Sequence, residues 1–206
     1  AIVFDMDGVL IDARDWHYEA LNEALEIFGV TISRSDHLAK FDGLPTKKKL
    51  STLVEQGQIP AGLTTMIETI KQERTLRAAA KLCFPRIEHI VMLAELQRWG
   101  WGIAVATNSI RETSRTMLAY AGVEPFLDYL VTNEDVRNAK PSPDIYKLAC
   151  QKLGVSPSRT LVIEDNHNGV TAAREAGCNV IKISEPKDLD LSLIEAWLAG
   201  EGQTFE

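Results

Sequence analysis

The first apolar segment of the chain ends in two closely spaced carboxylates. Residues 2–4 are apolar and predict a buried strand, and Asp5 and Asp7 follow it directly, ahead of Gly8, which permits a tight turn. Two buried carboxylates this close must take up a proton or bind a cation, and hard oxygen ligands favour Mg²⁺. The pair therefore predicts a Mg²⁺ site, with aspartates that only cap a helix or shape a turn as the alternative.

A second acidic pair, Glu164 and Asp165, ends the apolar segment 161–163 and precedes a helical pattern. If the two apolar segments are parallel strands, both acidic pairs lie on the same edge of a sheet and can converge on one ion. The apolar flanking residues argue against surface acids. Capping of the following helix is the structural alternative.

Two further polar groups follow apolar segments or turns. Thr107, Asn108 and Ser109 come after the segment 102–106, and a small hydroxyl with main-chain N–H groups at a helix start suits an anionic oxygen. Lys140 stands just before a proline-containing helix start. Each is a weak signal by itself, because a loop lysine is more often solvated than catalytic.

These polar groups need a scaffold that brings distant segments to one edge. The apolar segments at 2–4, 102–106, 129–131, 161–163 and 180–183 predict strands, and helical periodicity fills the stretches between most of them. This alternation predicts an α/β fold, a Rossmann-like parallel sheet core with helices on both faces. Ligands of such sheets bind beyond the carboxyl ends of the strands, where the acidic pairs are expected.

One long interval interrupts the alternation. Between residue 12 and about residue 84 only helical periodicity is found, and Pro85 cannot continue a helix interior. We therefore predict a core domain formed by residues 1–13 and 81–206, with an inserted α-helical domain of residues 14–80.

Composition and charge narrow the class of protein. Hydrophobic residues make up 45% and charged residues 25%, as in a soluble globular domain, and no apolar run is long enough to span a bilayer. The net charge of −7 repels phosphodiester backbones and acidic lipids, so we expect no nucleic-acid and no membrane partner. Three widely spaced cysteines fit a cytoplasmic protein, and no obligate protein partner is evident.

Taken together, four motifs resemble those of the haloacid dehalogenase-like (HAD) superfamily. They are the segment 5–9, residues 107–109, Lys140 with the following proline, and the Glu164–Asp165 pair, so the resemblance covers essentially the whole chain. The helical insertion looks like the small cap of the β-phosphoglucomutase and sugar-phosphatase branch. The resemblance implies the HAD fold and Mg²⁺ as cofactor.

The resemblance also implies roles for the acidic residues. Asp5 would attack phosphorus and form an aspartyl-phosphate, and Asp7 would act as general acid and base. Mg²⁺ would be bound by the side chains of Asp5 and Asp165 and by the main-chain carbonyl of Asp7. Glu164 would ligate the ion or orient its ligands.

The phosphoryl oxygens of the substrate have implied partners as well. Thr107, together with Asn108 and Ser109, would hold these oxygens as charge redistributes during transfer. Lys140 would contact the same oxygens and offset the charge of the acidic residues.

Substrate choice is expected to depend on the cap. His17 has the spacing of a cap histidine that faces the site in this branch, and Gly43, Lys47 and Lys48 belong to a segment that resembles its substrate-specificity loop. Gly43 would let the backbone approach the substrate, and the lysines would bind a substrate anion. A packed helix histidine and a solvated lysine face are the alternatives.

The function implied by the resemblance is a Mg²⁺-dependent phosphatase that hydrolyses a small phosphorylated metabolite, such as a sugar phosphate. A phosphosugar mutase of the β-phosphoglucomutase kind is the alternative, weakened because Asp42 and Thr46 stand where the mutase loop has two cations. A non-catalytic binding module is disfavoured because every chemical position is filled.

Overall fold

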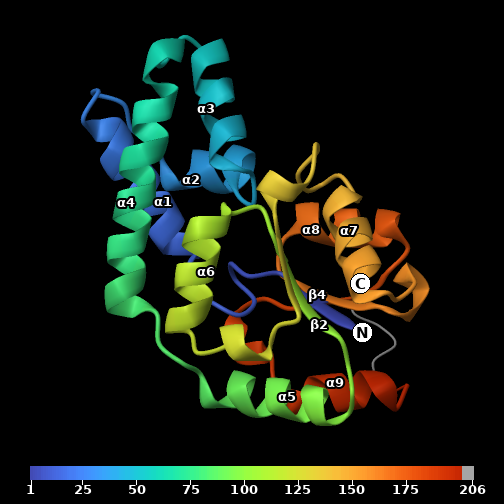
Figure 1. The fold of residues 1–206 in the computed structure, drawn as a ribbon. Helices are drawn as coiled ribbons and strands as arrows, with labels where there is room; N and C mark the ends of the chain where they lie inside the picture. Colours follow the sequence, from blue (N-terminus) through green and yellow to red (C-terminus); the bar gives the residue numbers. More distant parts are fainter. Residues whose placement is uncertain (201–206) are drawn as a thin grey trace. The chain divides into compact units, whose positions relative to one another are not determined.

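A five-stranded parallel sheet forms the centre of the fold in this computed structural model, which describes residues 1–200 (Figure 1). The strands are β1 (Ile2–Phe4), β2 (Ile103–Thr107), β3 (Tyr129–Thr132), β4 (Leu161–Glu164) and β5 (Asn179–Lys182). They lie in the order β3-β2-β1-β4-β5, and every neighbouring pair is parallel. The predicted α/β fold with a Rossmann-like parallel sheet is confirmed.

The middle strand, β1, has β2 and β4 as its neighbours. Phe4 pairs with Val105 of β2 and with Ile163 of β4. All residues of these three strands are buried, because both faces of the sheet are covered, and this explains why they read as continuous apolar runs. The register therefore places the residue after Phe4 between the ends of the two neighbouring strands.

Helices cover both faces of the sheet (Figure 1). On one face lie α7 (Asp144–Leu153) and α8 (His167–Ala176), and on the other lie α5 (Ile87–Arg98), α6 (Arg111–Tyr120) and α9 (Leu191–Leu198). Short 3₁₀ helices occur at Glu124–Phe126, Asn133–Asp135, Pro157–Arg159 and Pro186–Asp188. The small side chains of Ala172 and Ala173 let α8 pack closely against Val162 in the same buried cluster.

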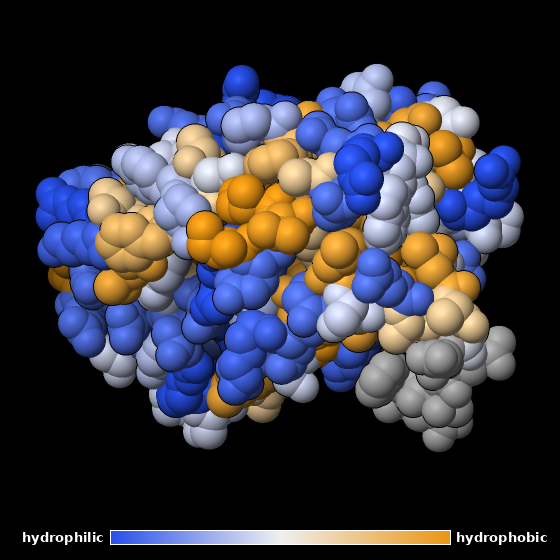
Figure 2. All heavy atoms as spheres, turned by 90° about the horizontal axis from the view of Figure 1, so that it is seen from below, coloured by the Kyte–Doolittle hydropathy of each residue, from blue (hydrophilic) through white to orange (hydrophobic). Residues whose placement is uncertain are grey.

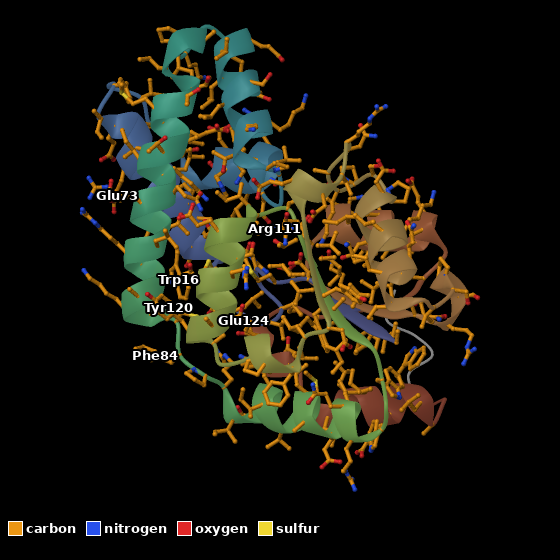
Figure 3. All side chains as sticks on the ribbon, in the orientation of Figure 1. Trp16, Glu73, Phe84, Arg111, Tyr120 and Glu124 are labelled. Atoms are coloured by element: carbon orange, nitrogen blue, oxygen red, sulfur yellow. The ribbon has the colours of Figure 1, made fainter. Side chains whose placement is uncertain are left out.

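An ion pair fixes the start of α6, just after the loop that leaves β2. Arg111, labelled in Figure 3, donates from Nη2 to the two carboxylate oxygens of Asp135 at 2.6 and 2.5 Å. Its main-chain N–H donates to Oε2 of Glu134 at 2.6 Å. A partly exposed ion pair contributes little stability, but its several contacts restrict the geometry of the loop between β2 and α6.

The chain divides into two compact units, one formed by Ala1–Asp12 with Cys83–Glu206 and the other by Ala13–Leu82. The second unit is helical and has its own apolar core, in which α1 (Arg14–Glu26) packs along α4 (Thr64–Leu82). Its elements are α1 (Arg14–Glu26), α2 (Arg34–Asp36), a π-helix (His37–Phe41), α3 (Thr46–Glu55), a 3₁₀ helix (Ala61–Leu63) and α4 (Thr64–Leu82).

The larger unit carries an apolar stripe on its outer surface. Phe84, Ile87 and Val91 are exposed, and the last two are one helical turn apart on α5. Figure 2, a view from below, shows apolar side chains gathered on this side of the molecule. None of the helices within residues 1–200 combines the length and the apolar character that crossing a bilayer requires.

Candidate active site

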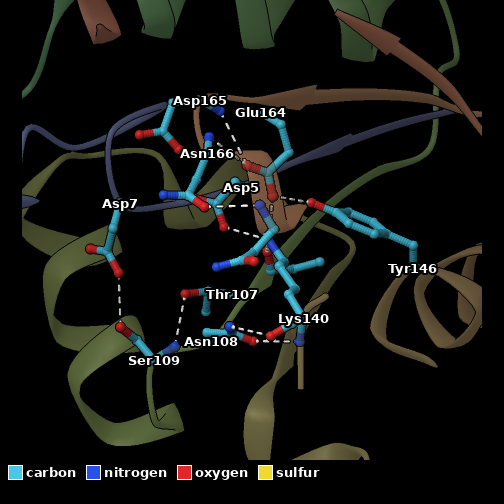
Figure 4. A network of polar contacts seen from close by, with 12 residues as sticks. Asp5, Asp7, Thr107, Asn108, Ser109, Lys140, Tyr146, Glu164, Asp165 and Asn166 are labelled. Carbon is cyan, nitrogen blue, oxygen red and sulfur yellow. Dashed lines mark hydrogen bonds and ion pairs between the residues drawn. The ribbon is translucent and has the colours of Figure 1, made fainter. Parts of the chain in front are cut away.

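Three strand ends bring the predicted polar groups together. The main-chain N–H of Asp5 donates to the carbonyl of Ile163 at 2.9 Å and so extends the pairing of β1 with β4. Thr107 is the last residue of β2, and Glu164 is the last residue of β4. All three polar side chains are buried, and Figure 4 shows them together with their polar contacts. The parallel register thus gathers two carboxylates and a hydroxyl at the carboxyl edge of the sheet.

A tight turn after β1 places the second aspartate. Gly8 has a φ of 94°, in the left-handed region that favours glycine, and its N–H donates to the carbonyl of Ile11 at 2.7 Å. Ile11 in turn donates to the carbonyl of Met6 at 3.0 Å. Within this turn Asp7 accepts a hydrogen bond at Oδ2 from the Ser109 hydroxyl at 2.8 Å. The turn therefore joins the first acidic pair to the loop after β2.

A buried ammonium connects the two acidic pairs. Nζ of Lys140 donates to Oδ1 of Asp5 at 2.5 Å, to Oε1 of Glu164 at 2.7 Å and to the carbonyl of Ala106 at 2.8 Å. These three acceptors match the three N–H groups of an ammonium. The side chain of Lys140 is only 4% exposed, so these contacts take the place of water around its charge.

The loop after β2 also holds Lys140 by its main chain. Oδ1 of Asn108 accepts from the main-chain N–H of Lys140 at 3.0 Å, and Nδ2 of Asn108 donates to its carbonyl at 3.3 Å. Nδ2 of Asn133 donates to the Asn108 carbonyl at 2.7 Å. The side chain of Asn108 thus orients Lys140. The position of Asn108 in the sequence did not predict this contact.

The electrostatics of the cluster follow from its burial. Burial alone would lower the pKa of Lys140, but the carboxylates of Asp5 and Glu164 outweigh it and hold that pKa above its usual value. The ammonium therefore stays charged. Burial raises the pKa of Asp5, as do the nearby carboxylates, while Lys140 opposes them. Keeping Asp5 ionised is thus easier when a further cation is close to it.

The acidic residues have the geometry of a cation site. Carboxylate oxygens of Asp5, Glu164 and Asp165 lie within 4.8 Å of one another. Asp5 and Glu164 are buried, unlike the exposed acids that cluster on many protein surfaces. A set of hard oxygen donors at this spacing fits a small divalent cation.

Two residues that sequence patterns did not single out surround Glu164. The hydroxyl of Tyr146 on α7 donates to Oε1 of Glu164 at 2.5 Å. Gly169 on α8 lies so close that a Cβ added there would be 1.7 Å from the same oxygen. A signal for Tyr146 was available, because a tyrosine beside Ile145 on an otherwise apolar helix face must find a partner for its hydroxyl.

The predicted cap residues all belong to the helical unit. His17 is half-buried on α1, and its Nδ1 accepts from Nζ of Lys71 at 2.9 Å. Gly43 is exposed with a φ of 69°, at the bend between the π-helix and α3. Lys47 and Lys48 are exposed near the start of α3. Their roles in substrate binding stay predictions.

The third residue of the lysine run faces inward instead. Lys49 is buried, and its Nζ lies 3.3 Å from Nε2 of His37. Burial lowers the pKa of His37 to about 4, with a further contribution from the neighbouring Lys49, so this histidine is neutral near pH 7. Because the pKa is depressed, the ring gains a proton only below the usual range for histidine.

A buried ammonium that bridges two acidic side chains at the carboxyl edge of a parallel sheet lies where α/β enzymes bind their ligands. Comparison with known proteins supports this class and specifies it. The family model described as haloacid dehalogenase-like hydrolase matches residues 2–183. The chain therefore belongs to the haloacid dehalogenase-like hydrolases, as the motifs predicted, and it is a hydrolase.

Individual relatives agree with this assignment. The chain is 30% identical to the "phosphorylated carbohydrates phosphatase" of Thermotoga maritima over 86% of its own length and 81% of the relative's. It is 28% identical to the "fructose-1-phosphate phosphatase YqaB" of Escherichia coli over 88% and 95% of the two chains. The crystal structure of CbbY from Rhodobacter sphaeroides in complex with phosphate superposes with a TM-score of 0.78 at 30% identity, covering 88% and 84%.

Gly169→Ala tests whether the position of Glu164 matters. The new methyl group would lie 1.7 Å from Oε1 and 2.3 Å from Oε2, and hydrogen bonds from several directions prevent this carboxylate from simply moving aside. We expect a loss of hydrolase activity of roughly 100-fold or more, measured by steady-state kinetics.

Gly100→Ala is the control, because Gly100 has a φ of 74° and no atom within 4 Å of an added Cβ. It should lower the thermal midpoint through backbone strain and leave activity intact. Equal activity in the two variants would contradict the expectation.

Proposed function

We propose that this chain is a Mg²⁺-dependent phosphatase that hydrolyses a small phosphomonoester, such as a sugar phosphate, through an aspartyl-phosphate. The observation that carries the proposal is the ammonium of Lys140, which bridges Asp5 and Glu164 beside Asp165. An anionic nucleophile and an anionic phosphate repel each other, and fixed positive charge at this point reduces the repulsion.

Asp5 is the proposed nucleophile. Its carboxylate would form a bond to phosphorus while the bond from phosphorus to the leaving oxygen breaks, and water would later attack the same phosphorus and restore the carboxylate. Lys140 holds Oδ1 at 2.5 Å and thereby fixes the orientation of the other oxygen. Mg²⁺, held by the side chains of Asp5 and Asp165 and the main chain of Asp7, would supply positive charge for the phosphoryl group.

Asp7 is the proposed general acid and base. It would give its proton to the leaving oxygen in the first half-reaction and take a proton from the attacking water in the second. The Ser109 hydroxyl donates to its Oδ2 at 2.8 Å, which restricts the rotation of this carboxyl group. Ser109 thus has a positioning contact in addition to the phosphate contact predicted for its main chain.

Thr107 is suited to bind a phosphoryl oxygen. Its Oγ1 accepts from the N–H of Ser109 at 3.0 Å, and the hydroxyl hydrogen can then be donated to the substrate. Lys140 and the main-chain N–H of Asn108 are the further proposed phosphate contacts, and the contact proposed for Ser109 requires its N–H to be shared with Thr107. These groups recognise only what all phosphomonoesters share, so we assign substrate selectivity to the helical unit as a cap, with His17, Gly43, Lys47 and Lys48 as its candidate residues.

Asp5→Asn should abolish turnover. An amide is a poor nucleophile and a poor metal ligand, so kcat is expected to fall by at least about 1,000-fold, which corresponds to roughly 4 kcal/mol of transition-state stabilisation. Release of inorganic phosphate from a panel of sugar phosphates is the measurement. Asp12→Asn makes the same chemical change at an exposed residue of the larger unit and should retain wild-type rates. A near-normal rate for Asp5→Asn would show that another group is the nucleophile.

Removal of divalent cations should stop hydrolysis reversibly. After dialysis against a chelator the protein is expected to release no phosphate, and added Mg²⁺ should restore the original rate, because Asp5 and Asp165 offer hard carboxylate oxygens close together, which suit this ion. Ca²⁺ should restore much less, since it is larger and takes more ligands at longer distances. Undiminished turnover in excess chelator would rule out the proposed metal dependence.

A partition experiment separates the phosphatase from the phosphosugar mutase. Given a hexose 1-phosphate and a catalytic amount of the hexose bisphosphate, the protein should release inorganic phosphate without accumulating the 6-phosphate isomer, as followed by ³¹P NMR. The reason is that Asp42 and Thr46 occupy positions where the mutase loop has cations for a second phosphate. Isomer forming faster than free phosphate would favour the mutase.

A further inference from the structure

Tyr146 places a hydroxyl inside the core next to the reactive cluster. The residue lies on α7, is fully buried, and packs in the apolar cluster that includes Ala104 and Val162. A buried hydroxyl without a partner is costly, and the partner here is Oε1 of Glu164 at 2.5 Å. Its ring also lies 4.8 Å from Nζ of Lys140, measured to the ring centre. Tyr146 therefore contacts both charges of the pair that adjoins Asp5.

The carboxylate of Glu164 is surrounded by four hydrogen-bond donors. Oε1 accepts from Tyr146 at 2.5 Å and from Lys140 at 2.7 Å. Oε2 accepts from the main-chain N–H groups of Asp165 at 3.1 Å and Asn166 at 3.3 Å. Each oxygen of this carboxylate thus accepts two hydrogen bonds, which is the number that its two lone pairs can accept. This arrangement suits a fixed counter-charge better than a metal ligand, which must turn a lone pair to the ion.

We infer that Tyr146 is a positioning residue for phosphoryl transfer: its hydroxyl fixes Glu164 so that the ammonium of Lys140 stays on Asp5. The inference rests on the proposed phosphatase mechanism. It assigns Glu164 the orienting role and leaves the side chains of Asp5 and Asp165 to bind the ion.

The physical reason lies in the competition for one ammonium. Lys140 donates to Asp5 at 2.5 Å and to Glu164 at 2.7 Å. The Tyr146 hydroxyl donates one of the two hydrogen bonds that Oε1 of Glu164 accepts. Without it, that buried oxygen has one donor fewer and draws the ammonium away from Asp5. The effect is largest in the transition state, because the stabilisation of the charge on the phosphoryl group depends on the placement of Lys140.

Tyr146→Phe isolates the hydroxyl, because it keeps the ring, its packing and its contact with Lys140. Tyr120→Phe is the matched control, since Tyr120 lies on α6 of the same unit and is 43% exposed. Each variant is compared with the wild type for kcat and KM, for inhibition by orthovanadate and by inorganic phosphate, for Mg²⁺ binding by calorimetry, and for thermal unfolding.

For Tyr146→Phe we expect kcat to fall roughly 10- to 100-fold, the range for a lost hydrogen bond to a buried charge, with KM changed less than about threefold. Orthovanadate resembles the transition state, so its affinity should fall by about the same factor as kcat/KM. Affinity for inorganic phosphate and for Mg²⁺ should stay within about threefold of the wild type, because neither depends on transition-state charge. Tyr120→Phe should match the wild type throughout.

Four results would overturn the inference. Wild-type kcat and orthovanadate affinity in Tyr146→Phe would show that the hydroxyl does not act on the reaction. Equal losses for orthovanadate and phosphate, or a variant that does not fold, would assign the hydroxyl to folding alone. A Mg²⁺ affinity lowered in step with kcat would assign it to the metal. The proposed function fails separately, when the wild type hydrolyses no phosphomonoester or Asp5→Asn is fully active.

Discussion

The site depends on a single buried ammonium that is shared by two carboxylates from different strands. Lys140 contacts Asp5 at 2.5 Å and Glu164 at 2.7 Å, with the Ala106 carbonyl as its third acceptor. Burying these charges is costly, and removing either partner would leave an uncompensated charge in the interior. The surrounding fold must therefore hold three strand ends and the loop that carries Lys140 close together. The adjacent, parallel strands β2, β1 and β4 bring those strand ends to one edge of the sheet.

Support for this interaction extends outward to residues that surround the three charged groups. The loop after β2 holds the main chain of Lys140 through Asn108, and α6 begins at Arg111, which is fixed by Asp135. On the other side Gly169 leaves room for the Glu164 carboxylate where any side chain would collide with it. These contacts reduce the freedom of the charged groups before the reaction starts, which is how a site of fixed charges lowers a barrier.

Much of this could be predicted from the sequence, for physical reasons that also mark the limit. The strands are buried on both faces, so apolar runs at 2–4, 102–106 and 161–163 revealed them, and the HAD motifs identified the family. Tyr146 and the side-chain contacts of Asn108 were missed because they depend on packing between segments far apart in the chain. The run of three lysines has no periodicity of its own, and only the packing of α3 shows that Lys49 is the buried one.

The geometry also explains how one lysine can serve both the resting site and the proposed reaction. In the resting structure all three N–H groups of Lys140 have acceptors, and two of these acceptors are charged. When Asp5 bonds to phosphorus, its oxygens lose the carboxylate charge, which passes through the leaving oxygen to Asp7 as that oxygen takes the proton of Asp7. The N–H group that pointed at Asp5 can then turn to an oxygen of the phosphoryl dianion that Asp5 now carries, while Glu164 and the Ala106 carbonyl retain the other two. An ammonium anchored on one side and released on the other thus stabilises both states, provided that its anchor does not move.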